Sequence, residues 1–178
     1  MEAESVFNKL TQYVKISVYI LLSWRGILTF GFCGLGVLLY FSIPWMPLQV
    51  LLARVIAVIF ELSGYSVLQI RNYIMVEHVE VEIGSVCTYI HLILIGLPFM
   101  WRGNDIVRDI LRMTLFAVLV STANIARIYF AIASHARGLP WKYAHDYISR
   151  PTYVPIVILI LLLWLTALKR RYEAQFKK

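Results

Sequence analysis

The stretch TYVPIVILILLLWLTAL, residues 152–168, decides the class of protein, because it is almost wholly apolar and holds no charged residue. A helix that crosses the apolar core of a bilayer needs roughly 20 residues of this kind, or somewhat fewer when protein covers its ends. The rest of the 178-residue chain agrees, since 60% of all residues are hydrophobic and 15% are charged, against about 25% charged in soluble domains. We therefore predict a protein that crosses the membrane several times.

Three earlier apolar stretches are predicted to cross the membrane as well: residues 27–43, 88–101 and 113–133. Residues 46–63 are also apolar, but they include Arg54 and Glu61, which are seven residues apart and therefore lie near one helix face. This segment is predicted to be an amphipathic helix in the membrane interface. The alternative is a fifth span with an internal ion pair.

The distribution of basic residues favours four spans, because short cytoplasmic loops collect Lys and Arg. With four spans, eleven basic residues share the side of both termini and five lie opposite, whereas five spans give eight against seven. We therefore predict one membrane domain whose N-terminal segment 1–26 and basic tail 169–178 are cytoplasmic. The net charge of +7 fits this topology and contacts with membrane lipids, and no nucleic-acid-binding pattern accompanies it.

The segment before the second span is predicted to form a small β element on the extracytoplasmic side. In VEVEI, residues 79–83, apolar and acidic side chains alternate strictly, as they do in a half-buried strand. Gly84 and Ser85 then break the strand, and Cys87 is expected to open the next helix. The predicted fold is thus an all-α polytopic membrane protein with four transmembrane helices, an interfacial helix and this β element.

Polar residues inside predicted spans are costly, and by default they mark function. Asn124 and Arg127 are three residues apart in the third span and share a helix face. Arg127 lies fourteen residues from Met113, and Cys87 lies fourteen residues from Trp101. At 1.5 Å per residue both side chains are about 21 Å from the cytoplasmic edge, so they are expected at one level. The alternative for Arg127 is a side chain that extends along the helix to the headgroups.

A third candidate, His145, lies in the predicted external loop 134–150, where the other histidine is His135. A thiolate is a nucleophile, an imidazole can move protons near neutral pH, and a guanidinium can hold an oxyanion. Cys87, His145 and Arg127 together are therefore suited to acyl transfer through a thioester. Cys87 and Cys33 stand outside any metal-ligand spacing, so no metal or cofactor is expected.

These features resemble the exosortase/archaeosortase family over about residues 25–168. The resemblance rests on a strand-like lead-in to a Cys at the start of a span, an Asn-x-x-Arg near the outer end of the next span, and an Ala-His in the following external loop. It implies a membrane-embedded cysteine protease or transpeptidase of the prokaryotic plasma membrane. Its implied substrates are proteins that end in a sorting motif, one transmembrane helix and a basic tail. The implied catalytic residues are Cys87, Arg127 and His145, with Asn124 as a supporting motif residue.

The sequence departs from the family pattern directly after Cys87. The family often has Cys-Ser-Gly, an apolar residue and Arg, whereas here Thr88, Tyr89, Ile90 and His91 follow. His91 lies one helical turn from Cys87, so it is a second candidate for the imidazole partner of the thiol.

Three basic residues lie against the positive-inside tendency, on the side of the predicted site. They could bind an acidic motif or a phosphate of an acceptor, or they could contact lipid headgroups. These residues are Arg137, Lys142 and Arg150.

Two other functions fit parts of the pattern. A b-type haem or electron-transfer subunit could use His91 together with His135 or His145 as axial ligands. A non-catalytic transport or scaffold protein could use Asn124 and Arg127 only to hold helices together.

Overall fold

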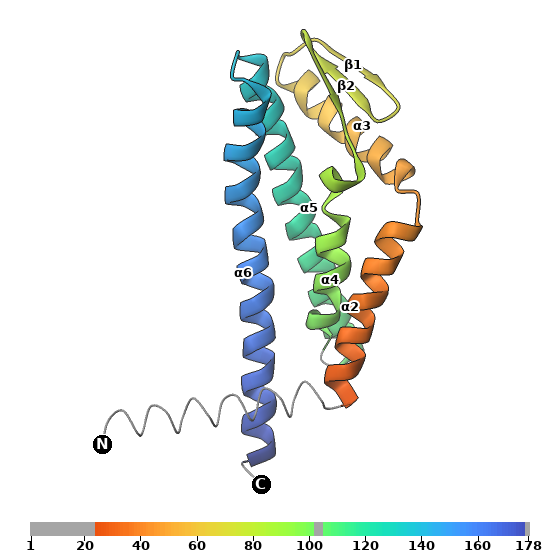
Figure 1. Cartoon of the computed structure of the whole chain (residues 1–178), viewed down its shortest axis with the longest axis vertical. Coiled ribbons are helices and arrows are strands. Elements are labelled where there is room, and N and C mark those ends of the chain that lie inside the picture. The colour runs from red at the N-terminus through yellow and green to blue at the C-terminus, as the bar shows by residue number, and fades with distance from the viewer. Residues whose placement is uncertain (1–23, 102–104, 177–178) are drawn as a thin grey trace, which may run out of the picture.

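The computed structural model describes residues 24–101 and 105–176 and is mostly helical, with one small sheet (Figure 1). The predicted cytoplasmic segment 1–26 therefore lies, up to residue 23, outside the described residues. The elements in chain order are α2 (Trp24–Ser42), α3 (Met46–Leu62), β1 (Val67–Ile70), β2 (Tyr73–Val76), β3 (Val79–Glu82), the 3-10 turn η1 (Ser85–Thr88), α4 (Ile90–Met100), α5 (Ile106–Ala136) and α6 (Trp141–Phe176).

Two helices, α5 and α6, are long and apolar enough to cross a membrane. A third candidate span consists of α2 and α3 taken together, which are joined at an angle of 82°. The predicted span at residues 88–101 contains the apolar helix α4, but its 11 residues measure about 16 Å, which is about half the apolar core of a bilayer. By length and composition, the described residues thus contain two or three candidate spans.

The bend between α2 and α3 follows from the local sequence. Pro44 precedes α3 and Pro47 occupies its first turn, where proline is tolerated because that N–H has no partner within the helix. Trp45 fixes the corner by donating from its indole nitrogen to the Tyr40 carbonyl at 2.8 Å. The predicted helix at residues 46–63 is therefore confirmed as a helix, and it turns sharply away from α2.

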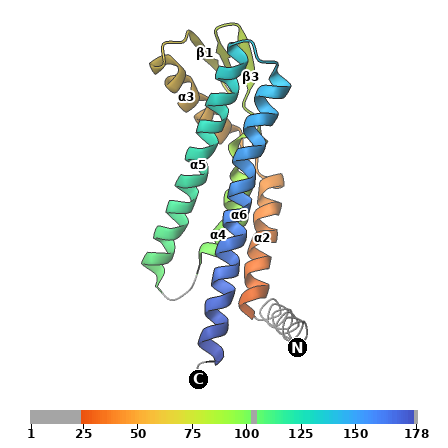
Figure 2. The same ribbon diagram turned by 90° about the vertical axis from the view of Figure 1, so that its left-hand side faces the viewer.

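The strand predicted at residues 79–83 is confirmed and forms one edge of an antiparallel sheet in the order β1-β2-β3. Both hairpin turns include a residue with positive φ, Arg71 and Glu77, each at 55°. One face of the sheet is buried against α3 and α5 through Ile74, Val76, Val79 and Val81, and the opposite face exposes Tyr73, Met75, Glu80 and Glu82. Figures 1 and 2 place this sheet and α3 together at one end of the helical bundle.

The connection from the sheet into α4 differs from the prediction. Cys87 does not open the helix, because residues Ser85–Thr88 form a 3-10 turn and Tyr89 then adopts a left-handed conformation with φ of 52°. The hydroxyl of Thr88 donates to the Ser85 carbonyl at 2.6 Å, which closes the turn one step before the reversal. The helix consequently begins at Ile90, three residues after Cys87.

The predicted external loop 134–150 is mostly helical. α5 continues to Ala136 and α6 begins at Trp141, so that a short turn through Gly138 (φ of 97°) joins them. The helix start comes from Pro140, whose carbonyl accepts from the amides of Tyr143 and Ala144. The predicted span at residues 152–168 lies within α6, which also contains Pro151 and Pro155.

Close helix packing stabilises the part of the bundle away from the sheet. A Cβ added at Gly36 of α2 would meet Leu94 of α4, and one added at Gly96 of α4 would meet the Phe116 ring of α5. The Cys33 thiol lies 3.5 Å from the Ile95 carbonyl, which agrees with a packing role for this cysteine. Buried residues of α4, α5 and α6 continue this core, including Leu92, Val120, Ile156 and Ile160.

Candidate functional site

The centre of the candidate site is the side-chain amide of Asn124 on α5. Its nitrogen donates to the Cys87 main-chain carbonyl at 2.6 Å, and its oxygen accepts from Nε of Arg127 at 3.2 Å. Asn124 is 1% exposed and Arg127 is also buried. One amide therefore connects two predicted site residues that are 40 positions apart in the sequence.

Arg127 is held from a second side by Tyr89, which the sequence analysis did not select. The central carbon of the Arg127 guanidinium lies 4.6 Å from the centre of the Tyr89 ring, within the range of a cation–π contact. Tyr89 is 4% exposed and has positive φ, a conformation that costs a residue with a Cβ about 1–2 kcal/mol. Sequence carries no direct signal for this role, because both the backbone reversal and the partner arise in the tertiary structure.

Cys87 lies in η1, the turn that connects the sheet to α4. Its side chain is half-buried and packs against the core formed by α3, the sheet and α5, and its amide donates to the Gly84 carbonyl at 3.0 Å. The contact with Asn124 is made by the main chain of Cys87 rather than by its sulfur. The backbone of Cys87 is thus fixed at the junction of η1, α4 and α5, to which Tyr89 and Arg127 also belong.

His91 is the imidazole that directly adjoins this group. Its ring centre lies 6.0 Å from that of Tyr89 and 5.3 Å from that of Tyr40. Its Nδ1 atom is buried and makes no hydrogen bond within the part of the chain that the structure describes. The left-handed turn at Tyr89 separates His91 from Cys87, so the two residues do not follow one another on a continuous helix face.

His145 lies in the first turns of α6, with its side chain 43% exposed. Its Nδ1 is 3.4 Å from a carboxylate oxygen of Asp146, and its ring centre is 5.7 Å from that of Trp141. It shares a helix face with Ile156 and Ile160, which pack toward α4 and α5. Among the contacts made by the described residues, none joins His145 to Cys87 or Arg127.

The other histidine of the predicted loop, His135, has a structural contact at the end of α5. Its Nδ1 lies 2.7 Å from the Leu139 carbonyl, and its ring centre lies 5.5 Å from that of Trp141. It therefore helps to close the turn between α5 and α6, whereas His91 belongs to the group around Tyr89. In the described ranges no contact brings His91 together with either proposed axial partner.

Of the three basic candidates for substrate binding, Arg137 and Lys142 have side chains that the structure describes. Arg137 donates from Nη2 to the Tyr65 hydroxyl at 3.3 Å, and this hydrogen bond raises the pKa of Arg137 above its ordinary value. Arg137 and Lys142 are exposed. The side chain of Arg150 lies outside the described part of the structure.

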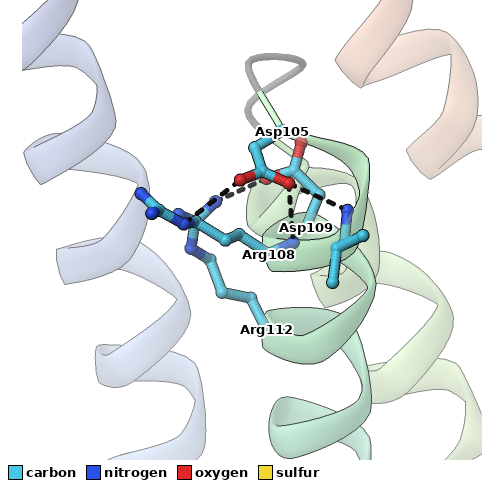
Figure 3. A network of polar contacts seen from close by, with 5 residues as sticks. Asp105, Arg108, Asp109 and Arg112 are labelled. Atoms are coloured by element: carbon cyan, nitrogen blue, oxygen red, sulfur yellow. Dashed lines mark hydrogen bonds and ion pairs between the residues drawn. The ribbon is translucent and has the colours of Figure 1, made fainter.

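The opposite end of α5 carries a second polar group that the sequence analysis did not single out (Figure 3). Asp105 caps the helix, accepting from the amides of Val107 and Arg108 at 3.1 and 3.2 Å, and its other oxygen lies 3.1 Å from Nε of Arg108. One turn further, the fully buried Asp109 pairs with Arg112. An acid at the cap followed by Asp-x-x-Arg is a local signal that could have identified this group.

In the described ranges, no three His, Cys, Asp or Glu side chains are arranged to hold a metal ion. The side chains at the junction of η1, α4 and α5 include a thiol, a guanidinium and an imidazole.

Comparisons with known proteins add no relative. No family model, no curated protein and no solved structure matches the chain. The likeness to exosortases and archaeosortases therefore rests on the residues quoted above.

Proposed function

We propose that the chain is a membrane-embedded cysteine protease or transpeptidase that cleaves C-terminal sorting signals through a thioester intermediate. The observation that carries this proposal is the Asn124 amide, which bonds both the Cys87 carbonyl and Arg127. The backbone of Cys87 and the side chain of Arg127, which come from distant parts of the sequence, are thereby held in one largely buried region. In such a region water is scarce and charges interact strongly, which supports the proposed roles of the thiolate and the guanidinium.

In the proposed first half-reaction, the Cys87 thiolate attacks the carbonyl carbon of the scissile peptide bond. Arg127 donates hydrogen bonds to the resulting oxyanion, as suits a group whose donors cannot act as a base. When the tetrahedral intermediate collapses, the C–N bond breaks and a protonated imidazole gives its proton to the departing amine. The C-terminal part of the substrate leaves, and the remainder stays bound to sulfur as a thioester.

In the second half-reaction, water or an acceptor amine attacks the thioester carbonyl. The imidazole takes the proton of this nucleophile, the C–S bond breaks, and Cys87 returns as a thiolate. Water gives hydrolysis and an amine gives transpeptidation.

The imidazole in this scheme is His145, with His91 as the alternative. His145 is accessible, because its side chain is 43% exposed. It lies in the first turns of α6, and Figure 2 shows this end of α6 beside the sheet. The ring of His91 contacts that of Tyr89, which in turn contacts Arg127. The Nδ1 atom of His91 makes no hydrogen bond within the described residues. The two assignments make opposite predictions for single substitutions.

We further propose that α2, α4, α5 and α6 are four spans, with both termini in the cytoplasm and the site on the extracytoplasmic side of a prokaryotic plasma membrane. The 11 residues of α4 suffice if η1 completes the crossing. Non-helical backbone at membrane depth is stable only where protein surrounds it, and η1 packs against α3, α4 and α5. The substrate's own transmembrane helix would lie in the lipid beside this bundle.

A second candidate function, a non-catalytic scaffold, is favoured by one observation. Asn124 bonds the main chain of Cys87, so that this connection persists whichever side chain stands at position 87. The scaffold hypothesis therefore predicts that Cys87→Ser leaves function intact.

The test is to co-express the chain with candidate substrates, chosen from the same genome as proteins that end in a motif, one apolar helix and a basic tail. Removal of the C-terminal segment is followed for wild type, Cys87→Ser, Arg127→Ala, His145→Ala and His91→Ala. Matched controls are Cys33→Ser, Arg108→Ala and His135→Ala, which lie outside the group around Asn124. We expect cleavage to stop in Cys87→Ser and Arg127→Ala and to continue in all three controls. Cleavage that persists in Cys87→Ser contradicts the proposal.

A further inference from the structure

Tyr89 has a backbone conformation that its sequence does not favour. It is left-handed, with φ of 52° and ψ of 14°, in a region that glycine and asparagine occupy far more readily than tyrosine. Residues held in such conformations persist where the surrounding structure determines them, and they concentrate at functional sites. The side chain of Tyr89 is therefore a candidate for a functional role.

The ring of Tyr89 contacts three neighbouring side chains. Arg127 lies over its face at 4.6 Å, and the rings of His91 and Tyr153 approach it edge-on at 6.0 and 6.2 Å. The ring of Tyr89 contacts Arg127 of α5, and Cys87 lies two residues before Tyr89 in η1. One residue thus links the segment that carries the thiol with the guanidinium.

Two contacts together fix the orientation of Arg127. Asn124 accepts from its Nε at 3.2 Å, and the central carbon of the guanidinium lies over the ring of Tyr89 at 4.6 Å. A hydrogen bond to Nε alone leaves the guanidinium able to turn about that bond, whereas an aromatic ring beneath the guanidinium restricts this motion. The terminal nitrogens of the guanidinium, which would meet an oxyanion, are therefore directed by both residues.

We propose that Tyr89 is a positioning residue, whose ring holds the Arg127 guanidinium beside Cys87 in the orientation needed for oxyanion stabilisation. This inference rests on the proposed function, because it assigns a task to one more residue of the same site. The contribution comes from the aromatic face rather than from the hydroxyl.

The test uses variants that separate the ring from the backbone. Tyr89→Phe keeps the ring, and Tyr89→Asn removes it while retaining a residue that tolerates positive φ. Tyr89→Gly is a second ring-free variant that fits the same backbone. Tyr153→Leu is the matched control, because it removes an edge contact to the Tyr89 ring and leaves the face over Arg127 in place.

For substrate cleavage, we expect kcat in Tyr89→Phe to remain within about twofold of wild type, and kcat in Tyr89→Asn to fall about 10- to 100-fold with little change in KM, because a misdirected oxyanion donor affects the transition state. Tyr153→Leu should cleave like wild type. Equal loss in Tyr89→Phe and Tyr89→Asn, or wild-type kcat in both ring-free variants, overturns the inference.

A second measurement needs no substrate and so distinguishes this inference from the proposed function. The rate at which a small maleimide alkylates Cys87 is measured in detergent in a Cys33→Ser background, for Tyr89→Asn, Arg127→Ala and the double variant. If Tyr89 acts through Arg127, each single variant slows alkylation and the double variant is no slower than Arg127→Ala. Independent, multiplicative effects, or an unchanged rate in Tyr89→Asn, overturn the positioning role. Absence of cleavage by wild type would instead overturn the proposed function.

Discussion

The two ends of α5 each fix an arginine, and they do so in different ways. At the end near Ile106, Arg112 pairs with Asp109 one turn earlier in the same helix. At the end near the sheet, Arg127 also bonds a residue one turn earlier, Asn124, but this partner reaches across to the Cys87 carbonyl, 37 positions away. The pair of Asp109 and Arg112 lies within one helix, whereas the group around Arg127 joins α5 to η1 and α4.

This difference shows what each group can support. A carboxylate three residues from an arginine neutralises its charge locally and stabilises the start of the helix. A neutral amide in the same position keeps a donor and an acceptor for different partners, so Asn124 connects a cation to another segment. Functional groups from distant parts of the sequence are therefore brought together at the end of α5 that carries Asn124.

The largest effect is expected where the long-range connection is removed. Asn124→Leu deletes the bridge in a place that is 1% exposed, and it leaves the Cys87 carbonyl and Nε of Arg127 without this partner. Unmade buried hydrogen bonds of this kind cost about 2–4 kcal/mol together. We expect a clearly lower midpoint of thermal unfolding in detergent and loss of cleavage.

The control for this prediction is Thr122→Ala, an exposed position on the same helix. Its unfolding midpoint should remain that of the wild type. If Asn124→Leu unfolds like Thr122→Ala, the bridge contributes nothing to stability and the contrast between the two ends of α5 disappears.

An intermediate effect is expected at the local group. Asp109→Asn keeps the shape of a fully buried side chain but removes its charge, which leaves Arg112 without its carboxylate. Because Arg112 is partly exposed, we expect a loss of about 1–2 kcal/mol, measured by thermal unfolding, with cleavage retained in the fraction that is folded.

The neighbouring Asp105→Asn is the matched control for Asp109→Asn. Asparagine is also a good helix cap, and the pair that is lost involves a highly exposed Arg108, so the change should be at most about 0.5 kcal/mol. A larger loss in Asp105→Asn than in Asp109→Asn would show that burial does not decide the strength of these pairs.

The smallest effect concerns an exposed contact on the sheet. A hydrogen bond to Glu82 and the negative charge of that residue raise the pKa of Tyr73. The neutral phenol is thus favoured in the folded state, so its contribution to stability is present below about pH 10 and is lost as the pH rises through the raised value. The pKa of Tyr73 can be measured by an absorbance titration of phenolate, as the difference between wild type and Tyr73→Phe. In a Glu82→Gln background this pKa should return toward its ordinary value.

Much of the fold could be predicted from the sequence because its signals are local. The apolar runs predicted the helices, and the alternation at residues 79–83 predicted β3. The predicted boundaries were wrong at the external loop: residues 134–150 were predicted as a loop, but α6 begins after Pro140 and continues through Pro151. Likewise, Cys87 follows a turn but precedes a reversal at Tyr89 that no composition signal announces.

The candidate site could be predicted only in part, for the same reason. The i,i+3 spacing of Asn124 and Arg127 and the equal depth of Cys87 pointed to residues that the structure does bring together. Tyr89 could not be predicted, because its ring meets Arg127 only after the chain reverses. His145 remains a prediction, since its described contacts are with Trp141 and Asp146.

The two prolines inside α6 have a mechanical consequence. Each lacks the N–H that would close a turn of the helix, so the stretch from Pro151 to Pro155 holds fewer backbone hydrogen bonds than the turns on either side. The part of α6 that carries His145 is therefore connected to the part after Pro155 through the turn of this helix with the fewest main-chain donors.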